Sequence, residues 1–211
     1  MTVPTVHPAS ARPVLEPWQA LVWRVEADPA GLRDTARQQM RQVLAHYTGG
    51  AVDGVCLDVE PGQPPRTQTH WRGWPLSLSV SRAGRHAVVG LCAGARLGLD
   101  LVLVEAVPDG TQVARHFLGP AATLSLAQAL PAQRDHVFAR AWAEMEARSK
   151  CLGLGLEEWS PARQARLHGG GLSCVDLTLD QACASAHTRL VLAVAMQRLG
   201  PGEGEPQAPI R

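Results

Sequence analysis

The sequence lacks both a long apolar run and an excess of charge of one sign. Its 211 residues carry 20 basic and 19 acidic groups, for a net charge of +1. Such a chain has no broad basic surface for nucleic acid and no polybasic membrane anchor. No stretch approaches the roughly 20 apolar residues of a membrane span, and the first residues lack the apolar core of an export signal. We therefore expect a cytoplasmic protein without a nucleic-acid or membrane partner, in which any anionic ligand is held by a local cluster of cations.

Cysteine is also sparse. The five cysteines are odd in number and show no C-x-x-C spacing, so no zinc site is indicated. Most of them lie inside apolar runs, which predicts buried, reduced thiols: Cys56, Cys92, Cys151, Cys174 and Cys183. An apolar content of 45% is sufficient for a proper core.

The order of helical and strand-forming segments indicates an α+β protein with two similar halves. Residues 1–17, rich in proline and alanine, are predicted to form an extended arm, and residues 199–211 a disordered tail. The turn sequence Val107-Pro-Asp-Gly-Thr111 is the best candidate for a boundary. It divides the chain into an N-terminal half, 18–107, and a C-terminal half, 108–198.

Hydrophobic periodicity predicts the elements of the N-terminal half. Apolar residues at helical spacing predict a helix over 35–47, capped by Asp34 and ended by Gly49-Gly50. Short apolar or alternating runs predict strands at 21–25 and 52–59, and a hairpin whose strands are 76–80 and 87–92.

The C-terminal half is predicted by the same rules. A near-continuous apolar strand at 97–104 is followed by helical material at 124–130, a long helix beginning near Phe138, and strands at 172–179 and 188–196. Asp135 is placed to cap the long helix. Its buried stripe is predicted to contain Phe138, Trp142, Met145, Ser149 and Leu152.

Asp100 interrupts the most apolar strand of the sequence, LGLDLVLVE. A carboxylate in such a run must meet a cation, a metal or strong hydrogen-bond donors, or else be protonated, because its desolvation costs several kcal/mol. A functional role and a structural ion pair would explain it equally well.

Two other charged patterns have alternative interpretations. Glu146 and Lys150 are spaced i,i+4 beside the buried stripe of the long helix, where such a pair is usually an ordinary surface ion pair. Arg33, Arg37 and Arg41 repeat every four residues, which fits either a solvated helix face or a cradle for a phosphate.

Taken together, these stretches resemble two signatures of the 4′-phosphopantetheinyl transferase family, in the group of stand-alone enzymes of polyketide and nonribosomal peptide pathways. LGLDL resembles the family's G-[VI]-D-[IL]-E strand, and WAEMEARSKCLGLGL resembles its W-x-x-K-E-[AS]-x-x-K-x-x-G-x-G-[LI] helix. The RGWP and SVS stretches at 72–75 and 79–81 stand where the family has R-G-K-P and S-x-S-H-S segments.

The resemblance implies two α+β halves related by a pseudo-two-fold axis, with coenzyme A bound in the cleft between them. It implies a magnesium-dependent transfer of the 4′-phosphopantetheine arm from coenzyme A to a serine of an acyl or peptidyl carrier protein, which leaves 3′,5′-ADP. We expect a monomer. Phosphoryl transfer requires neutralised phosphate charge and an activated hydroxyl, which hard oxygen ligands and magnesium supply.

The resemblance also implies roles for individual residues. Asp100 and Glu146 would hold the magnesium ion, Glu146 would accept the serine proton, and Lys150 would contact the pyrophosphate. Weaker matches place Arg72, Ser81 and Arg82 against coenzyme A, and Arg37 or Arg41 at its 3′-phosphate.

Three positions depart from the family pattern. Val102 replaces the second acidic residue of the strand motif, Met145 replaces a lysine of the helix motif, and Arg82 replaces a histidine. Two alternatives to an active transferase therefore remain at the level of sequence. One is a catalytically impaired family member that binds carrier proteins or coenzyme A, and the other is an unrelated α+β protein in which these charges are structural.

Overall fold

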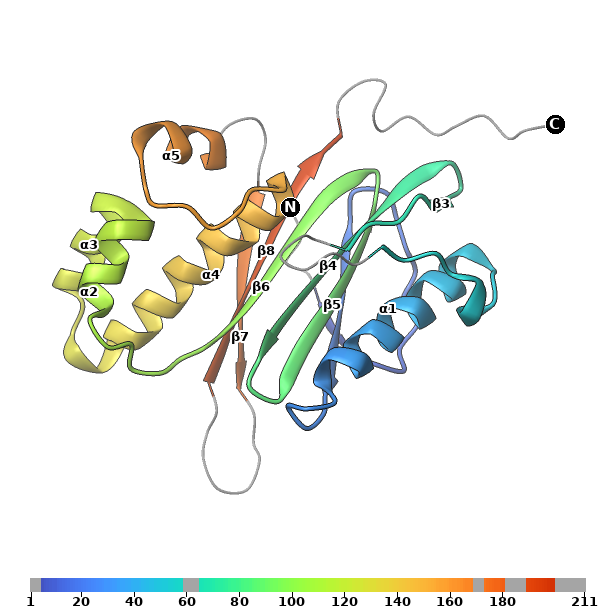
Figure 1. Ribbon diagram of the computed structural model, residues 1–211, viewed down its shortest axis with the longest axis horizontal. Helices are drawn as coiled ribbons and strands as arrows, with labels where there is room; N and C mark the ends of the chain where they lie inside the picture. Colours follow the sequence, from blue (N-terminus) through green and yellow to red (C-terminus); the bar gives the residue numbers. More distant parts are fainter. Residues whose placement is uncertain (1–4, 59–64, 169–172, 181–188, 200–211) are drawn as a thin grey trace.

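The computed structural model describes residues 5–58, 65–168 and 189–199, together with the backbone of residues 173–180. It is a mixed α+β fold with two sheets (Figure 1). The first sheet has the order β1-β2-β5-β4-β3 and the second the order β6-β8-β7. All neighbouring strands are antiparallel except β1 and β2, which are parallel. The strands are β1 (Val6–Pro8), β2 (Ala20–Glu26), β3 (His70–Trp71), β4 (Trp74–Ala83), β5 (His86–Ala93), β6 (Ala95–Leu103), β7 (Ser173–Asp180) and β8 (Arg189–Arg198).

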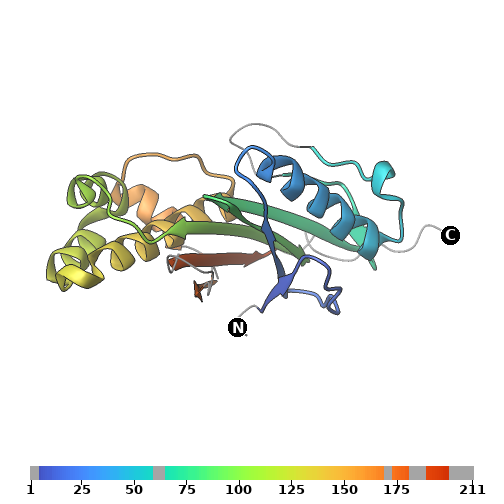
Figure 2. The ribbon, with the colours of Figure 1, turned by 90° about the horizontal axis from the view of Figure 1, so that it is seen from below.

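One long helix packs on each sheet (Figures 1 and 2). Helix α1 (Leu32–Thr48) covers the first sheet, and α4 (Arg134–Leu152) covers β6 and β8 of the second. Three shorter helices pack against the side of α4 that faces away from the sheet: α2 (Gly110–Val113), α3 (Gly119–Gln128) and α5 (Pro161–His168). A π-helical turn (Ala114–Leu118) joins α2 to α3. Within the described residues, no helix is long and apolar enough to cross a membrane.

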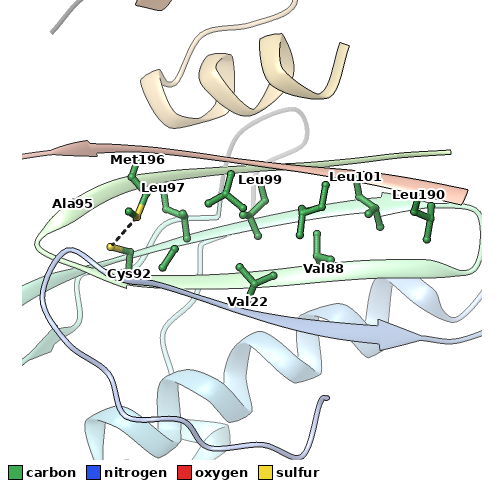
Figure 3. Packing of buried hydrophobic residues seen from close by; sticks show 12 residues of the cluster. Val22, Val88, Cys92, Ala95, Leu97, Leu99, Leu101, Leu190 and Met196 are labelled. Atoms are coloured by element: carbon green, nitrogen blue, oxygen red, sulfur yellow. Dashed lines mark hydrogen bonds between the residues drawn. The ribbon is translucent and has the colours of Figure 1, made fainter. Parts of the chain in front are cut away.

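Strand β6 separates two buried clusters because its side chains alternate between faces. Leu97, Leu99 and Leu101 pack against Val22 and Val88 of the first sheet, as Figure 3 shows. The intervening positions face α4, where Val102 packs against the alanines of the helix. Asp100 therefore lies on the α4 side of β6, buried between a sheet and a helix.

Two serines join the sheets along the edge of β6. The Ser79 hydroxyl accepts a hydrogen bond from the Leu99 amide at 2.8 Å, and the Ser81 hydroxyl accepts one from the Leu101 amide at 3.0 Å. In this way β4 side chains satisfy β6 amides that no backbone of the first sheet pairs. These bonds place Ser81 of β4 beside Asp100, which lies between Leu99 and Leu101 on β6.

Most predicted elements are present, although their ends differ. The hairpin, the strand at 97–104 and both long helices are confirmed. The capping predictions were wrong, because α1 begins after Gly31 and α4 after Gln133, neither with a side-chain cap. Asp34 and Asp135 instead lie inside the first turns, where their charge favours the helix dipole.

The strand predicted at 52–59 was wrong. Residues Val52–Gly54 form a 3₁₀ turn, and Asp58 forms only an isolated bridge with Arg66. The Asp53-Gly54 pair is a strong turn signal that outweighs the apolar residues around it. Cys56 in this segment is exposed, contrary to the prediction, whereas Cys92 and Cys151 are buried free thiols as expected.

The change from the first sheet to the second does not coincide with the predicted boundary at residue 107. Strand β6 pairs with β8, so the change from one sheet to the other occurs at Gly94, between β5 and β6. The pseudo-two-fold relation of the halves stays a prediction. So does the extended arm at residues 1–17, in which β1 is the only strand described. Residues 200–211 of the predicted tail lie outside the described residues.

Gly98 permits the close approach of α4 to β6. A Cβ at this position would overlap the Ala147 carbonyl oxygen and lie 2.5 Å from the Cys151 amide nitrogen. We expect Gly98→Ala to push the end of α4 away from β6 and to lower the free energy of unfolding by about 1–3 kcal/mol. Thermal unfolding followed by circular dichroism measures the effect. Gly155→Ala is the matched control, since a Cβ there meets nothing within 4 Å, and an equal loss in both variants would contradict the explanation.

Candidate functional site

Asp100, Lys150 and Ser81 form a buried polar cluster between β4, β6 and α4. The Lys150 ammonium lies 2.6 Å from Asp100 Oδ1, and the Ser81 hydroxyl donates to the same oxygen at 2.9 Å. Lys150 also donates to the Leu99 carbonyl at 3.1 Å and to Ser81 Oγ at 3.3 Å. The Asp100 side chain is 9% exposed and that of Lys150 28%. The predicted need of the Asp100 carboxylate for a cation is thus met by Lys150.

Local geometry places both members of this ion pair. Asp100 faces α4 because it alternates with the inward leucines of β6. Lys150 lies in the last turn of α4, where a positive charge also favours the helix dipole. Gly153, with φ of 66°, ends the helix in a left-handed conformation. The interpretation of Lys150 as half of a surface pair with Glu146 was wrong, because its ion pair crosses to β6.

Glu146 is half-buried, one turn before Lys150 on α4. Burial raises its pKa, and the neighbouring charge of Asp100 raises it further, whereas Lys150 and Arg163 act in the opposite direction. Burial likewise raises the pKa of Asp100 against the opposing effects of Lys150 and Ser81. Two carboxyl groups with raised pKa values and one ammonium therefore gather at the end of α4, as clusters at catalytic sites do.

Three arginines of the predicted phosphate site, Arg33, Arg37 and Arg82, lie on the α1 side of β4, opposite to the side that carries Ser81 and faces Asp100. Arg82 and Arg33 line a cleft of about 380 Å³ between the start of α1 and the β4–β5 turn. Burial, and then the positive charges of Arg33 and Arg37, lower the pKa of Arg82. Mutual repulsion of this kind is relieved by an anion. The remaining residues that line the cleft are Pro29, Ala30, Leu32, Asp34 and Gly84.

Arg72 and Arg41 are placed differently from the other predicted contacts. Arg72 lies in the two-residue turn before β4, with φ of 49° and its guanidinium 4.8 Å from the centre of the Trp71 ring. Eight residues of β4, Trp74–Ser81, lie between it and Arg82, a length of roughly 26 Å. Arg41 is exposed one turn beyond Arg37 on α1. The structure therefore places Arg82 with Arg33 at the cleft. Arg37 pairs with Asp34 near enough for its charge to act on Arg82, Arg41 continues the row along α1, and Arg72 lies at the other end of β4.

The two carboxylates are chemically suited to a magnesium ion. Both offer hard oxygen ligands, and the charge of Asp100 raises the pKa of Glu146, an unfavourable interaction that Lys150 offsets in part and that a bound cation would offset further. In the described part of the chain, no group of three or more histidine, cysteine or acidic residues converges on one point. Val102 offers no ligand oxygen, so Asp100 and Glu146 are the residues that would hold the ion.

Sequence reasoning missed two features of this region. The first is that Lys150 is the only lysine of the sequence, which otherwise uses nineteen arginines as its basic residues. This bias is a further signal that position 150 requires an ammonium group. The helix α5 was also missed, although Ser160-Pro161 is a helix-start signal and the Ser160 hydroxyl accepts a hydrogen bond from the Arg163 amide at 3.1 Å. No sequence pattern would have placed Arg163 near Glu146.

Comparison with known protein families shows that residues 96–195 match the family model of the 4′-phosphopantetheinyl transferase superfamily. The matched segment contains Asp100, Glu146 and Lys150, and it excludes Ser81, Arg82 and the arginines of α1. Comparison with curated protein sequences gives no match.

Proposed function

We propose that the chain is a 4′-phosphopantetheinyl transferase, whose superfamily model matches residues 96–195, and that it transfers the 4′-phosphopantetheine group of coenzyme A to a serine of an acyl or peptidyl carrier protein. The observation that carries the proposal is the buried ion pair of Asp100 and Lys150 inside the matched segment, with Glu146 one turn before Lys150 on α4 and within reach of the Asp100 charge. The match itself indicates a transferase of phosphopantetheine, and the carrier-protein substrate belongs to the proposal.

Glu146 is the proposed base. Its raised pKa keeps it a better proton acceptor at neutral pH than an ordinary glutamate, while its half-buried position leaves it accessible to a serine hydroxyl. The serine oxygen attacks the phosphorus that bears the pantetheine arm, and the serine proton passes to Glu146. The bond from this phosphorus to the bridging oxygen of the pyrophosphate breaks, so 3′,5′-ADP leaves.

Lys150 is the proposed cation at the pyrophosphate. Its ammonium is held by Asp100, Ser81 and the Leu99 carbonyl, and 28% of the side chain stays exposed. These bonds occupy the three N–H donors of the ammonium. Its fixed positive charge would therefore stabilise the leaving group electrostatically, with little reorganisation. Asp100 and Glu146 would hold a magnesium ion, which when bound supplies further neutralisation of phosphate charge.

The arginine cleft is the proposed site of the nucleotide. Arg82 and Arg37, with Arg33, would bind the 3′-phosphate through charge-assisted hydrogen bonds. Arg41 extends the same row of arginines. Ser81, the neighbour of Arg82 on β4, lies on the other face of the strand, where its hydroxyl donates to Asp100. Arg72 would take part only if coenzyme A reached the opposite end of β4.

Substitution of Arg82 tests the nucleotide site. We expect Arg82→Leu to weaken the binding of coenzyme A about tenfold, because one charge-assisted contact to phosphate is lost. The same variant should bind dephospho-coenzyme A with nearly wild-type affinity, and calorimetry measures both constants. Arg85→Leu is the matched control, since Arg85 pairs with Glu26 at the surface. Equal losses for both ligands would contradict a 3′-phosphate contact.

Product analysis tests the reaction. Wild-type protein, coenzyme A, magnesium and an apo carrier protein should yield 3′,5′-ADP, detected by chromatography, in an amount equal to the carrier modified. Omission of the carrier should stop its formation. Release of 3′,5′-ADP at the same rate without the carrier would show hydrolysis in place of transfer and would contradict the proposal.

A further inference from the structure

Arg163 of α5 is a buried cation, only 3% exposed. Its Nη1 lies 3.2 Å from an oxygen of Glu157, whose side chain is 59% exposed, and its Nη2 donates to Ser149 Oγ at 3.1 Å. Its Nε is buried and lacks a hydrogen-bond acceptor among the described residues. Burial of a guanidinium with an unpaired donor and one solvent-screened partner is unfavourable for stability. The arrangement therefore calls for a role beyond packing.

The guanidinium lies against Met145, the residue that replaces a lysine of the helix motif. Arg163 Nη2 is 3.8 Å from Met145 Sδ, and the Ser149 hydroxyl is 3.6 Å from the same sulfur. A lysine side chain continues two bonds past the position of this sulfur, about 2.5 Å. The ammonium of a lysine at position 145 would thus reach the space that the Arg163 guanidinium fills.

We propose that Arg163 is a positioning residue, which supplies from α5 the positive charge that α4 lacks at Met145 and so fixes the turn of α4 that bears Glu146. The inference rests on the proposed function for its catalytic consequence. The two helices are held in register for this purpose, since Leu167 of α5 is buried with Met145 in one apolar cluster and Ser160 caps α5. Arg163 acts through α4 and contacts neither substrate.

Relocation of the charge tests the proposal. The proteins compared are the wild type, Arg163→Met, Met145→Lys, and the double variant that carries both. Arg163→Met should lower kcat about tenfold with little change in KM. Met145→Lys alone places two cations together and should lower Tm by about 3–6 °C. In the double variant the lysine replaces the guanidinium, so Tm and kcat should both return close to the wild-type values.

Arg148→Met is the matched control. It tests whether loss of any arginine that joins α4 to α5 has the same effect as loss of Arg163. Arg148 also joins α4 to α5, through its contact with the Leu167 carbonyl at 3.4 Å, and it pairs with Glu144. Met145→Lys should not rescue Arg148→Met. Additive losses of Tm and kcat in the Arg163 double variant, or equal rescue of Arg148→Met, would overturn the proposal. If the wild type itself transfers nothing, the proposed function fails, while the Tm values of the four proteins still decide where the charge belongs.

Discussion

Glu146→Gln should lower kcat by about 10²–10⁴-fold, because the amide cannot accept the serine proton and is a poorer metal ligand. The same substitution should leave the protein at least as stable as the wild type. The pKa of Glu146 is raised by burial and by Asp100, so the folded protein binds this proton more tightly than the unfolded chain. Its contribution to stability is present below the unfolded pKa and is lost as pH rises through the folded pKa. Glutamine removes that loss.

Steady-state transfer rates and thermal unfolding at pH 5 and pH 8 measure both effects. Glu144→Gln is the control on the same helix. Its carboxylate pairs with Arg148 and its side chain is 40% exposed, so we expect less than about a twofold change in kcat and a small loss of stability. A Glu146→Gln protein with wild-type kcat, or a Glu144→Gln protein equally impaired, would remove Glu146 from the proposed mechanism.

Lys150→Met should abolish measurable transfer and also destabilise the fold. Asp100 would keep Ser81 as a donor but lose its cation inside the interface of β6 and α4. Removal of one partner of a buried pair costs about 3–5 kcal/mol, and the partial exposure of Lys150 places the expected loss near 2–3 kcal/mol at neutral pH.

The loss in Lys150→Met should depend on pH. Burial already raises the pKa of Asp100 in the wild type, and removal of the opposing effect of Lys150 raises it further. Stability is then greatest when Asp100 is protonated and falls as pH rises through its folded pKa. Chemical unfolding should therefore show a larger difference from the wild type at pH 8 than at pH 5. The Asp100→Asn/Lys150→Met double variant should recover most of the stability but no activity, and failure to recover it would show that the ion pair is not the cause.

The sequence was sufficient to predict features that depend on local pattern or on the cost of burial. The alternation in β4 identifies the leucines that pack under α1. The predicted stripe of α4 identifies only the face that packs against the shorter helices, because the face on the sheet consists of Ala139, Ala143 and Ala147, whose small side chains give a weak hydrophobic signal. The apolar run around Asp100 requires a partner for its carboxylate, and the structure supplies Lys150. These predictions succeed because each follows from a periodicity or from desolvation of a single charge.

Contacts between distant segments could not be predicted in this way. Ser79 and Ser81 bond to β6 amides, although the two strands belong to different sheets. The placement of Arg163 beside Met145 depends on the packing of α5, and the removal of Arg72 from the arginine cleft depends on the direction of β4. Each is decided by tertiary packing, on which neither propensity nor spacing carries information.

Intact-mass spectrometry of an apo carrier protein tests the central claim most directly. The carrier is incubated with wild-type protein, coenzyme A and magnesium, beside a matched carrier whose acceptor serine is replaced by alanine. We predict that the wild-type carrier gains the mass of one phosphopantetheine group, that the alanine carrier gains none, and that Glu146→Gln gives at most a trace. No mass gain with any carrier protein from the same genome, although the protein is folded and binds coenzyme A, would contradict the assignment as a transferase.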